Sequence, residues 1–183
     1  KNKDIFSFKT KNKIYLHSFS KKLCGKYRPG HFKGVLNVVN RFLELLSPKY
    51  IFLGKKDFQQ LILIGKNIKK NKINTTVVPC KTVRDQLSVP FSSRNFNLKK
   101  QDQILASKVF KFLKKEKAYI KRKKIKKINL SSIKKKILKM GVKKIDYIEV
   151  INLDNLNKAK KYNENFNIFS AFYIQKVRLI DNF

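Results

Sequence analysis

Hydrophobic side chains recur every three or four residues between positions 33 and 46, which is the spacing of one face of a helix. The members of this stripe are Val35, Val38, Val39, Phe42, Leu43 and Leu46. Pro48 interrupts the pattern, and a short unbroken apolar run at 50–53 follows before Gly54. The pattern predicts an amphipathic helix and then a strand that is covered on both faces.

A second helix is predicted directly after this strand, with Asp57 as its N-terminal cap. The predicted buried face of this helix consists of Phe58, Leu61, Ile62 and Ile68. A stretch rich in Thr and Val at 73–78 predicts the next strand. Strand, helix and strand form a βαβ unit, and a parallel sheet of this kind places its ligand crevice where the strands end. We therefore expect chemistry at 54–57 and after Pro79.

The character of the chain changes after a loop at 79–91, where helices and then strands are predicted. The two helices are marked by the faces Leu105, Val109, Phe112, Leu113 and Ile133, Ile137, Met140, the second lying between a cap at Ser131 or Ser132 and a stop at Gly141. Strands are expected at 145–151, 168–174 and 177–181. The sequence thus predicts an α/β chain with a partial parallel sheet in 1–84 and a small α+β domain in 85–183.

The charge of the 183 residues is strongly positive, at a formal +34, while 42% of the residues are hydrophobic. That apolar share excludes most disordered classes, and no apolar run is long enough for a membrane span. No leader-like segment is seen, so the default location is the cytoplasm.

The basic residues comprise 39 Lys and only 6 Arg. Because phosphate and base recognition favours arginine, we interpret the excess as compositional drift ahead of nucleic-acid binding. The Lys-rich run at 114–127 is expected, on the same reasoning, to be a solvated surface between the two helices, with a polyanion patch as the alternative.

Cysteine, histidine and glycine exclude several kinds of site. Cys24 and Cys80 are far apart and His17 and His31 are the only histidines, so no zinc pattern is present. The two cysteines are expected to be thiols, and His17 to have a structural role. The six glycines form neither a dinucleotide-binding fingerprint nor a P-loop.

Three polar clusters lie where loops meet predicted elements. They are 28–32, with Arg28 and His31, 54–60, and 92–95. A helix N-terminus with Lys56 beside it can hold an anion, while Arg94 and the adjacent serine hydroxyls can bind phosphate oxygens. Gln60 lies about one helical turn beyond Lys56 and can contact a small polar substrate next to the phosphates.

Five sequence motifs follow one another along the chain: RPGHFKGV, FLGKKDFQQL, TVRDQ, SSRN and VRLIDN. Together they resemble the pantoate-beta-alanine ligase family over about 23–182, which corresponds to the C-terminal two-thirds of such an enzyme. The resemblance implies a nucleotidyltransferase-superfamily enzyme, with a Rossmann-like domain, a C-terminal domain that closes over the site, and a homodimeric state. It also implies adenylation of pantoate by ATP and then attack by beta-alanine, with no nucleic-acid or membrane partner.

The resemblance assigns roles to the clusters as well. Lys56 and Arg94 would be the catalytic residues. The ATP-binding set would be Gly54, Lys55, Lys56, Asp57, Val83, Phe91, Ser92, Ser93 and Arg94. Gln60 would hold pantoate, and Arg28 and His31 would line the cleft unless His31 caps the next helix. We expect Lys56 and Arg94 to close on the same nucleotide tail.

The sequence departs from the family pattern at three places. Lys55 stands where the family usually has Glu, and Leu87 and Ser88 replace an Asp-Gly pair. Because serine tolerates a positive φ poorly, the second change is expected to alter the turn before the serines. The HxGH signature and the residues that bind Mg²⁺ are absent, so we expect a fragment that is inactive alone. A Lys-rich RNA-binding protein and a degenerate, non-catalytic relative are the alternatives.

Overall fold

The computed structural model of the chain describes residues 11–124, 128–159 and 161–183, which fall into two compact units. Unit 1 is Lys1–Lys81 and unit 2 is Thr82–Phe183. The boundary between the units thus falls between residues 81 and 82, a few residues before the one that the sequence suggested between 84 and 85. No helix in the described part of the chain is both long and apolar enough to cross a membrane.

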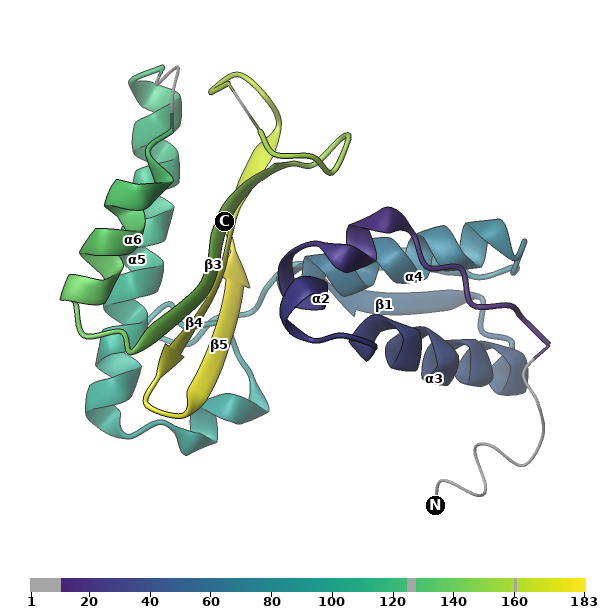
Figure 1. The fold of residues 1–183 in the computed structure, drawn as a ribbon. Coiled ribbons are helices and arrows are strands. Elements are labelled where there is room, and N and C mark those ends of the chain that lie inside the picture. Colours follow the sequence, from purple (N-terminus) through teal and green to yellow (C-terminus); the bar gives the residue numbers. More distant parts are fainter. Residues whose placement is uncertain (1–10, 125–127, 160) are drawn as a thin grey trace. The chain divides into compact units, whose positions relative to one another are not determined.

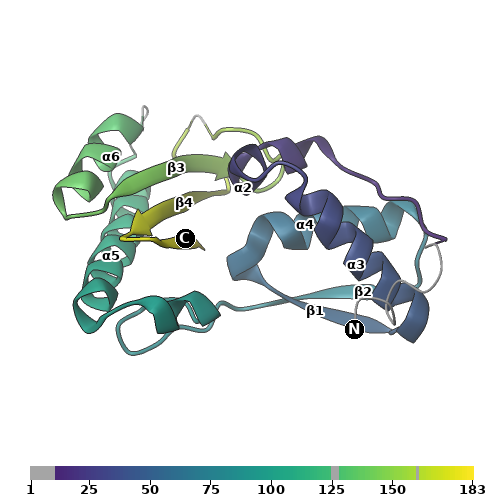
Figure 2. The same cartoon turned by 60° about the horizontal axis from the view of Figure 1, so that its bottom comes forward.

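Unit 1 contains the βαβ arrangement that the sequence predicted. Its elements are the 3-10 turn η1 (Ser18–Lys21), α2 (Leu23–Tyr27), α3 (His31–Leu46), β1 (Tyr50–Gly54), the 3-10 turn η2 (Lys55–Asp57), α4 (Phe58–Lys70) and β2 (Thr76–Cys80). The two strands run parallel, and Gly54 lies opposite Cys80 (Figure 1 and Figure 2). The strand expected at 73–78 is real but shifted towards Cys80.

The buried faces of the two helices of unit 1 overlap only in part with those that the sequence suggested. In α3 the core is centred on Leu36 and Leu43, while the expected core residue Leu46 is 71% exposed. In α4 the predicted Leu61 and Ile68 are buried together with Leu63 and Ile64, whereas the predicted Ile62 is only half-buried. Both helices carry apolar residues around much of their circumference, so spacing alone does not identify the flank that meets the neighbouring helix.

The prediction that β1 is covered on both faces is wrong. Ile51 and Leu53 pack against the core of α3 and α4, but Tyr50 and Phe52 point to the other face and are 47% and 67% exposed. Their rings lie 6.5 Å apart. The strand is apolar on both sides, yet only one side meets a helix within the described residues of unit 1.

A buried pair of amides ties the first described residues to the two helices of unit 1. Asn67 Nδ2 donates to Asn40 Oδ1 over 2.6 Å, and both residues are fully buried. Asn67 Oδ1 accepts from the Tyr15 amide at 2.9 Å, and Asn40 Nδ2 donates to the Asn12 carbonyl at 3.3 Å. Because an unpaired buried amide is costly, these bonds specify where residues 12–15 run across α3 and α4.

Unit 2 is an antiparallel sheet with two long helices on one face (Figure 1). Its elements are the 3-10 turn η3 (Ser93–Asn97), α5 (Lys100–Arg122), α6 (Leu130–Lys139), β3 (Lys144–Asn152), β4 (Phe166–Ile174) and β5 (Val177–Asn182), with strand order β3-β4-β5. The core brings Phe110 and Leu113 of α5 against Ile148 and Phe172 of the sheet. The α+β architecture and its three strands are confirmed.

The Lys-rich run does not separate the two helices, in contrast to the expectation from the sequence. Residues 114–122 form the last turns of α5, because Ile120 is buried and continues the apolar face of that helix. Residues 125–127 lie outside the described part of the chain. The cap of α6 is also different: Asn129, and not Ser131 or Ser132, caps it by accepting from the Ser132 amide.

One ion pair joins the two ends of unit 2. The Arg84 guanidinium donates to both carboxylate oxygens of Asp181, at 2.6 and 3.0 Å, and Asp181 is 2% exposed. A second pair, Arg178 to Asp146 at 2.7 Å, links β5 to β3 across β4. The motifs TVRD and VRLIDN are therefore structural partners, which spacing along the sequence did not reveal.

We expect Arg84→Met to lower the free energy of unfolding of unit 2 by about 3 kcal/mol, because the Asp181 carboxylate stays buried without its guanidinium. Thermal and denaturant unfolding of the chain measure this change. Arg122→Met, which also removes an arginine but from an exposed site, should change stability by less than about 0.5 kcal/mol. Equal effects of the two substitutions would contradict the importance of the ion pair.

Candidate active site

The candidate residues of unit 1 gather at the carboxyl end of β1. Gly54 ends the strand, and the turn η2 carries Lys55, Lys56 and Asp57 directly into α4. Lys56 is half-buried, while the other two turn residues are exposed. Gln60 lies in the first turn of α4 and is half-buried. This end of the strand is where a parallel sheet presents groups to a ligand.

Asp57 occupies the N-cap position of α4, as expected, but its side chain makes no capping hydrogen bond. Its backbone has φ −91° and ψ 50°, outside the extended conformation that caps usually adopt. The prediction of a capping carboxylate is therefore wrong, although the position is right.

Arg28 and His31 lie next to each other at the start of α3. Arg28 Nη1 is 2.9 Å from His31 Nε2. Gly30 is the N-cap residue of the helix, with φ +78°, and His31 is the first helical residue. The alternative role for His31, as a helix cap, is thus taken by glycine. With the arginine as donor, the imidazole nitrogen accepts and is unprotonated.

Gln59, which sequence reasoning overlooked, is a structural residue beside the candidate site. It is 6% exposed, and its Nε2 donates to the Phe19 carbonyl at 2.6 Å and the Lys22 carbonyl at 2.7 Å. These bonds attach η1 and the start of α2 to α4. The sequence did contain a hint of this role. Gln59 and Gln60 are consecutive on a helix, so their side chains point in different directions and are expected to have different roles.

The candidate residues of unit 2 lie on the loop that leads into η3. The Phe91 amide donates to the Val83 carbonyl at 3.1 Å, and both side chains are largely exposed, at 60% and 67%. Ser92 caps η3 by accepting from the Arg94 amide at 3.3 Å. Ser93 and Arg94 are exposed. The loop thus presents two apolar side chains, a hydroxyl and a guanidinium to solvent.

Lys56 belongs to unit 1 and Arg94 to unit 2, so the expectation that they close on one nucleotide tail stays a prediction.

The electrostatic surroundings of His17 agree with a structural role. Its Nδ1 accepts from the Phe19 amide at 3.2 Å, which caps η1. Burial lowers the pKa of His17, and the positive charges of Lys66 and Lys22 lower it further. The ring therefore stays neutral and keeps its acceptor nitrogen at neutral pH.

The described residues hold no group of three His, Cys, Asp or Glu side chains that could bind a metal ion. The Mg²⁺ that the family resemblance implies is therefore not matched by a protein-only site in residues 11–124, 128–159 or 161–183.

Comparison with known proteins identifies the family of the chain. A family model described as pantoate-beta-alanine ligase matches residues 1–183. The pantothenate synthetase of Francisella tularensis subsp. novicida (strain U112) is 40% identical over 161 residues, which are 88% of this chain and 53% of that relative. The chain belongs to the pantoate-beta-alanine ligase family. It spans about half the length of the curated relatives that it matches.

Solved structures show the same fold. The pantoate-beta-alanine ligase of Francisella tularensis, crystallised with beta-gamma ATP and beta-alanine, is 37% identical with a TM-score of 0.76, over 99% of this chain and 61% of that one. The pantothenate synthetase of Thermus thermophilus is 23% identical with a TM-score of 0.81, over 93% and 62%. The fold is thus the nucleotidyltransferase type that the sequence suggested.

We expect Gln59→Leu to lower the free energy of unfolding by about 1.5 kcal/mol, because two buried hydrogen bonds are lost. Gln60→Leu changes the neighbouring half-buried side chain, which does not hold η1 to α4, and should alter stability by less than about 0.5 kcal/mol. Chemical denaturation of both variants checks this. A larger loss for Gln60→Leu would show that the roles of the two glutamines are exchanged.

The backbone conformation of Ser88, in the Leu87-Ser88 pair, is expected to lower the stability of unit 2. Ser88 has φ +66°, its amide donates to the Asp85 carbonyl at 2.9 Å, and its carbonyl accepts from Arg84 at 3.1 Å. Ser88 therefore adopts the left-handed conformation that glycine favours. It costs a non-glycine residue about 1 kcal/mol.

Ser88→Gly should consequently raise the free energy of unfolding by about 0.5 kcal/mol, since the relief of strain is partly offset by a more flexible unfolded chain. Ser131→Gly, in the first turn of α6, should instead lower the free energy of unfolding, because glycine has a lower helix propensity than serine. Melting temperatures of the two variants test the contrast, and a destabilising Ser88→Gly would overturn the argument.

Proposed function

We propose that this chain is a part of a ligase that uses ATP to condense pantoate with beta-alanine. One observation carries the proposal. The residues to which the resemblance assigns phosphate and substrate binding form two groups, and each group lies where a loop meets a helix or strand. Lys56 and Gln60 lie at the end of β1, and Ser92 to Arg94 lie at the start of η3. A chain retained only for its charge would have no reason to keep this arrangement.

The proposed reaction has two steps. A pantoate carboxylate oxygen attacks the α-phosphorus of ATP, and pyrophosphate leaves, which yields pantoyl adenylate. The amine of beta-alanine then attacks the acyl carbon, AMP leaves, and an amide forms as the amine loses a proton. A carboxylate is a poor electrophile, so adenylation supplies the leaving group, and the protein chiefly positions substrates and stabilises phosphate charge.

In the proposed site, the residues at the end of β1 act on the phosphates and on pantoate. Lys56 neutralises charge that develops on the leaving pyrophosphate. The backbone amides at the start of α4 add the positive end of a helix dipole on the same side. Gln60 offers an amide to the hydroxyl or carboxylate oxygens of pantoate. Lys55 adds a second positive charge where the family usually has a carboxylate.

The residues of the loop before η3 would bind the nucleotide from unit 2. Arg94 can form two parallel hydrogen bonds to phosphate oxygens, and the Ser93 hydroxyl can donate one more. Val83 and Phe91 are exposed apolar side chains that can border the base and ribose. Arg28 and His31 remain proposed as cleft residues of unit 1.

Unit 1 has features of an incomplete sheet, which supports the idea that the activity needs more of the family fold. Parallel sheets are normally covered on both faces, but β1 exposes Tyr50 and Phe52 on one side. The chain also covers only 53% of its Francisella relative. We propose that further strands and helices of a ligase, including an HxGH segment, complete unit 1.

A cytoplasmic location and a homodimeric state are proposed on the family resemblance alone. The Lys-rich RNA-binding alternative is not favoured, because it gives no reason for the KDFQQ and SSRN motifs. The Mg²⁺ that accompanies ATP would neutralise phosphate charge when bound, and no described residue is assigned to hold it.

The test is a chimera in which the part of the Francisella enzyme that precedes the matched region is joined to this chain. We expect the chimera to catalyse pantoate-dependent exchange between ATP and pyrophosphate, and the 183-residue chain alone to show none. A folded chimera without exchange would favour the degenerate, non-catalytic alternative.

Within the chimera, Lys56→Ala and Arg94→Ala should each lower exchange by about a hundredfold or more, which is the usual effect of losing a preorganised charge contact. Their folding stability should change little because both side chains are at least partly exposed. Lys69→Ala and Arg122→Ala remove exposed charges elsewhere and serve as matched controls. Unchanged exchange in the first two variants would contradict the assigned roles.

A further inference from the structure

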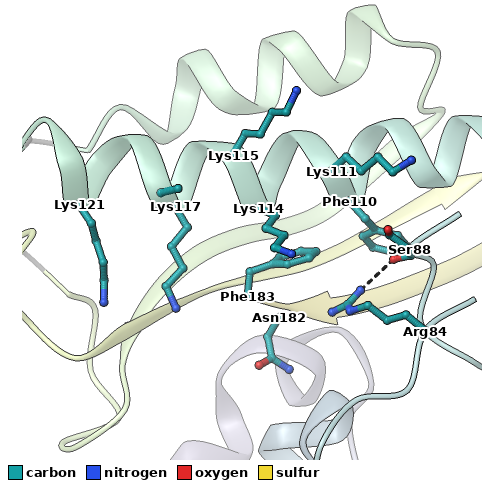
Figure 3. Close-up of a pocket in the computed structure, with 11 residues that line it drawn as sticks. Arg84, Ser88, Phe110, Lys111, Lys114, Lys115, Lys117, Lys121, Asn182 and Phe183 are labelled. Carbon is teal, nitrogen blue, oxygen red and sulfur yellow. Dashed lines mark hydrogen bonds between the residues drawn. The ribbon is translucent and has the colours of Figure 1, made fainter. Parts of the chain in front are cut away.

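Unit 2 contains a pocket that none of the residues assigned to ATP or pantoate lines. It has a volume of about 710 Å³ and lies beside α5, between that helix, the loop at 84–88 and the end of β5 (Figure 3). Six of its lining residues are basic: Arg84, Lys111, Lys114, Lys115, Lys117 and Lys121. No acidic side chain is among the described residues that line it.

Three of the lysines extend into the same space. Lys114, Lys117 and Lys121 follow one another at intervals of three and four residues, so they share one face of α5. Figure 3 shows all three on the side of the helix where Asn182 and Phe183 lie, whereas Lys115 extends to the opposite side. The three ammonium groups therefore form a row along the pocket.

The carboxylates of the described residues nearest to this row are engaged with other cations. Asp181, the acidic residue of β5, is already bound by Arg84 in the buried ion pair. Glu116 of α5 pairs with Lys136 of α6 at 3.8 Å. Lys117 Nζ donates instead to a neutral acceptor, Asn167 Oδ1, at 2.6 Å.

Lys117 is the half-buried member of the row, whereas Lys114 and Lys121 are exposed. Lys117 and Lys121 both lie over the ring of Phe166, with their Nζ atoms 5.7 and 5.3 Å from its centre. Burial lowers the pKa of Lys117 to about 8, and the charge of Lys121 contributes to the shift. An anion between the two ammonium groups would offset their mutual repulsion.

The floor of the pocket is apolar. Phe110 is 1% exposed, and its ring centre lies 6.1 Å from that of Phe183. The Arg84 guanidinium, held by Asp181, lies 5.0 Å from the centre of the Phe183 ring. Ala118 of α5 completes the apolar part of the lining. A fully hydrated inorganic ion would leave this floor unused, while an apolar group would cover it.

We propose that this pocket binds a small organic anion that carries two or more phosphate or comparable groups on an apolar body. The anionic groups lie along the row formed by Lys114, Lys117 and Lys121, and the apolar body covers Phe183 and Ala118. The inference goes beyond the proposed ligase function, because it uses no residue that takes part in that reaction. A pocket of this volume also favours a small molecule over a nucleic acid, which needs exposed rings for its bases.

The probe for a test is pyrenetetrasulfonate, a planar aromatic tetra-anion whose fluorescence anisotropy reports binding to the complete 183-residue chain. We expect saturable binding that inorganic tripolyphosphate displaces only at higher concentration, because it lacks an apolar body. Binding should not change in Arg94→Ala, which separates this site from the proposed ATP site. No saturable binding, or loss of binding in Arg94→Ala, would overturn the proposal.

Two triple variants with the same change in net charge provide the decisive comparison. Lys114→Gln/Lys117→Gln/Lys121→Gln alters the row, whereas Lys108→Gln/Lys135→Gln/Lys139→Gln alters exposed lysines that do not line the pocket. We expect the first to weaken binding at least about tenfold and the second by no more than about twofold, since exposed charges farther away are screened by salt. Equal losses would show diffuse attraction to a basic surface and would overturn the proposal.

If the first triple variant does not fold, Lys114→Gln/Lys121→Gln keeps the bond from Lys117 to Asn167 and is compared with Lys108→Gln/Lys135→Gln in the same way. A single-stranded RNA oligonucleotide is added as a competitor. Displacement of the probe by RNA at lower concentration than by tripolyphosphate, with no dependence on the row, would also overturn the proposal in favour of nucleic-acid binding.

Discussion

The buried ion pair between Arg84 and Asp181 is the interaction on which most of unit 2 depends. It joins residues 97 positions apart, so the loop that it closes includes almost all of unit 2. It also holds the loop at 84–88 in place, since Arg84 donates at the same time to the Ser88 carbonyl. Arg84 lies in the chain between Val83 and Phe91, the two apolar candidate nucleotide residues, and it also lines the pocket with the lysines, so neither is independent of its geometry.

The sequence was informative about elements and less so about which of their faces are buried. The strands of unit 2 were located within a residue or two because alternating and β-branched residues are bounded by clear turn signals. In α3, by contrast, apolar residues such as Phe42 and Leu46 widen the stripe beyond the part that meets α4. Lysines with long apolar stems also hid the true length of α5, because a helix tolerates them wherever one face stays apolar.

The candidate site could be found from motifs but not assembled from them. Lys56, Gln60 and Ser92 were identified because family motifs fall at the ends of predicted elements, and the structure puts each of them at such an end. The structural role of Gln59, which reaches back to carbonyls 37 and 40 positions away, could not be foreseen. Contacts over such separations depend on packing, and no local pattern reports them.

The uncovered aromatic face of β1 has a consequence for how the chain behaves in solution. An exposed apolar face of this kind is a surface through which molecules can associate. The formal charge of +34 opposes this association by mutual repulsion. Dissolved salt screens that repulsion while leaving apolar attraction intact. Ionic strength therefore sets the balance between dispersed and self-associated forms of the isolated polypeptide. Helices that covered this face of β1 would remove the apolar attraction.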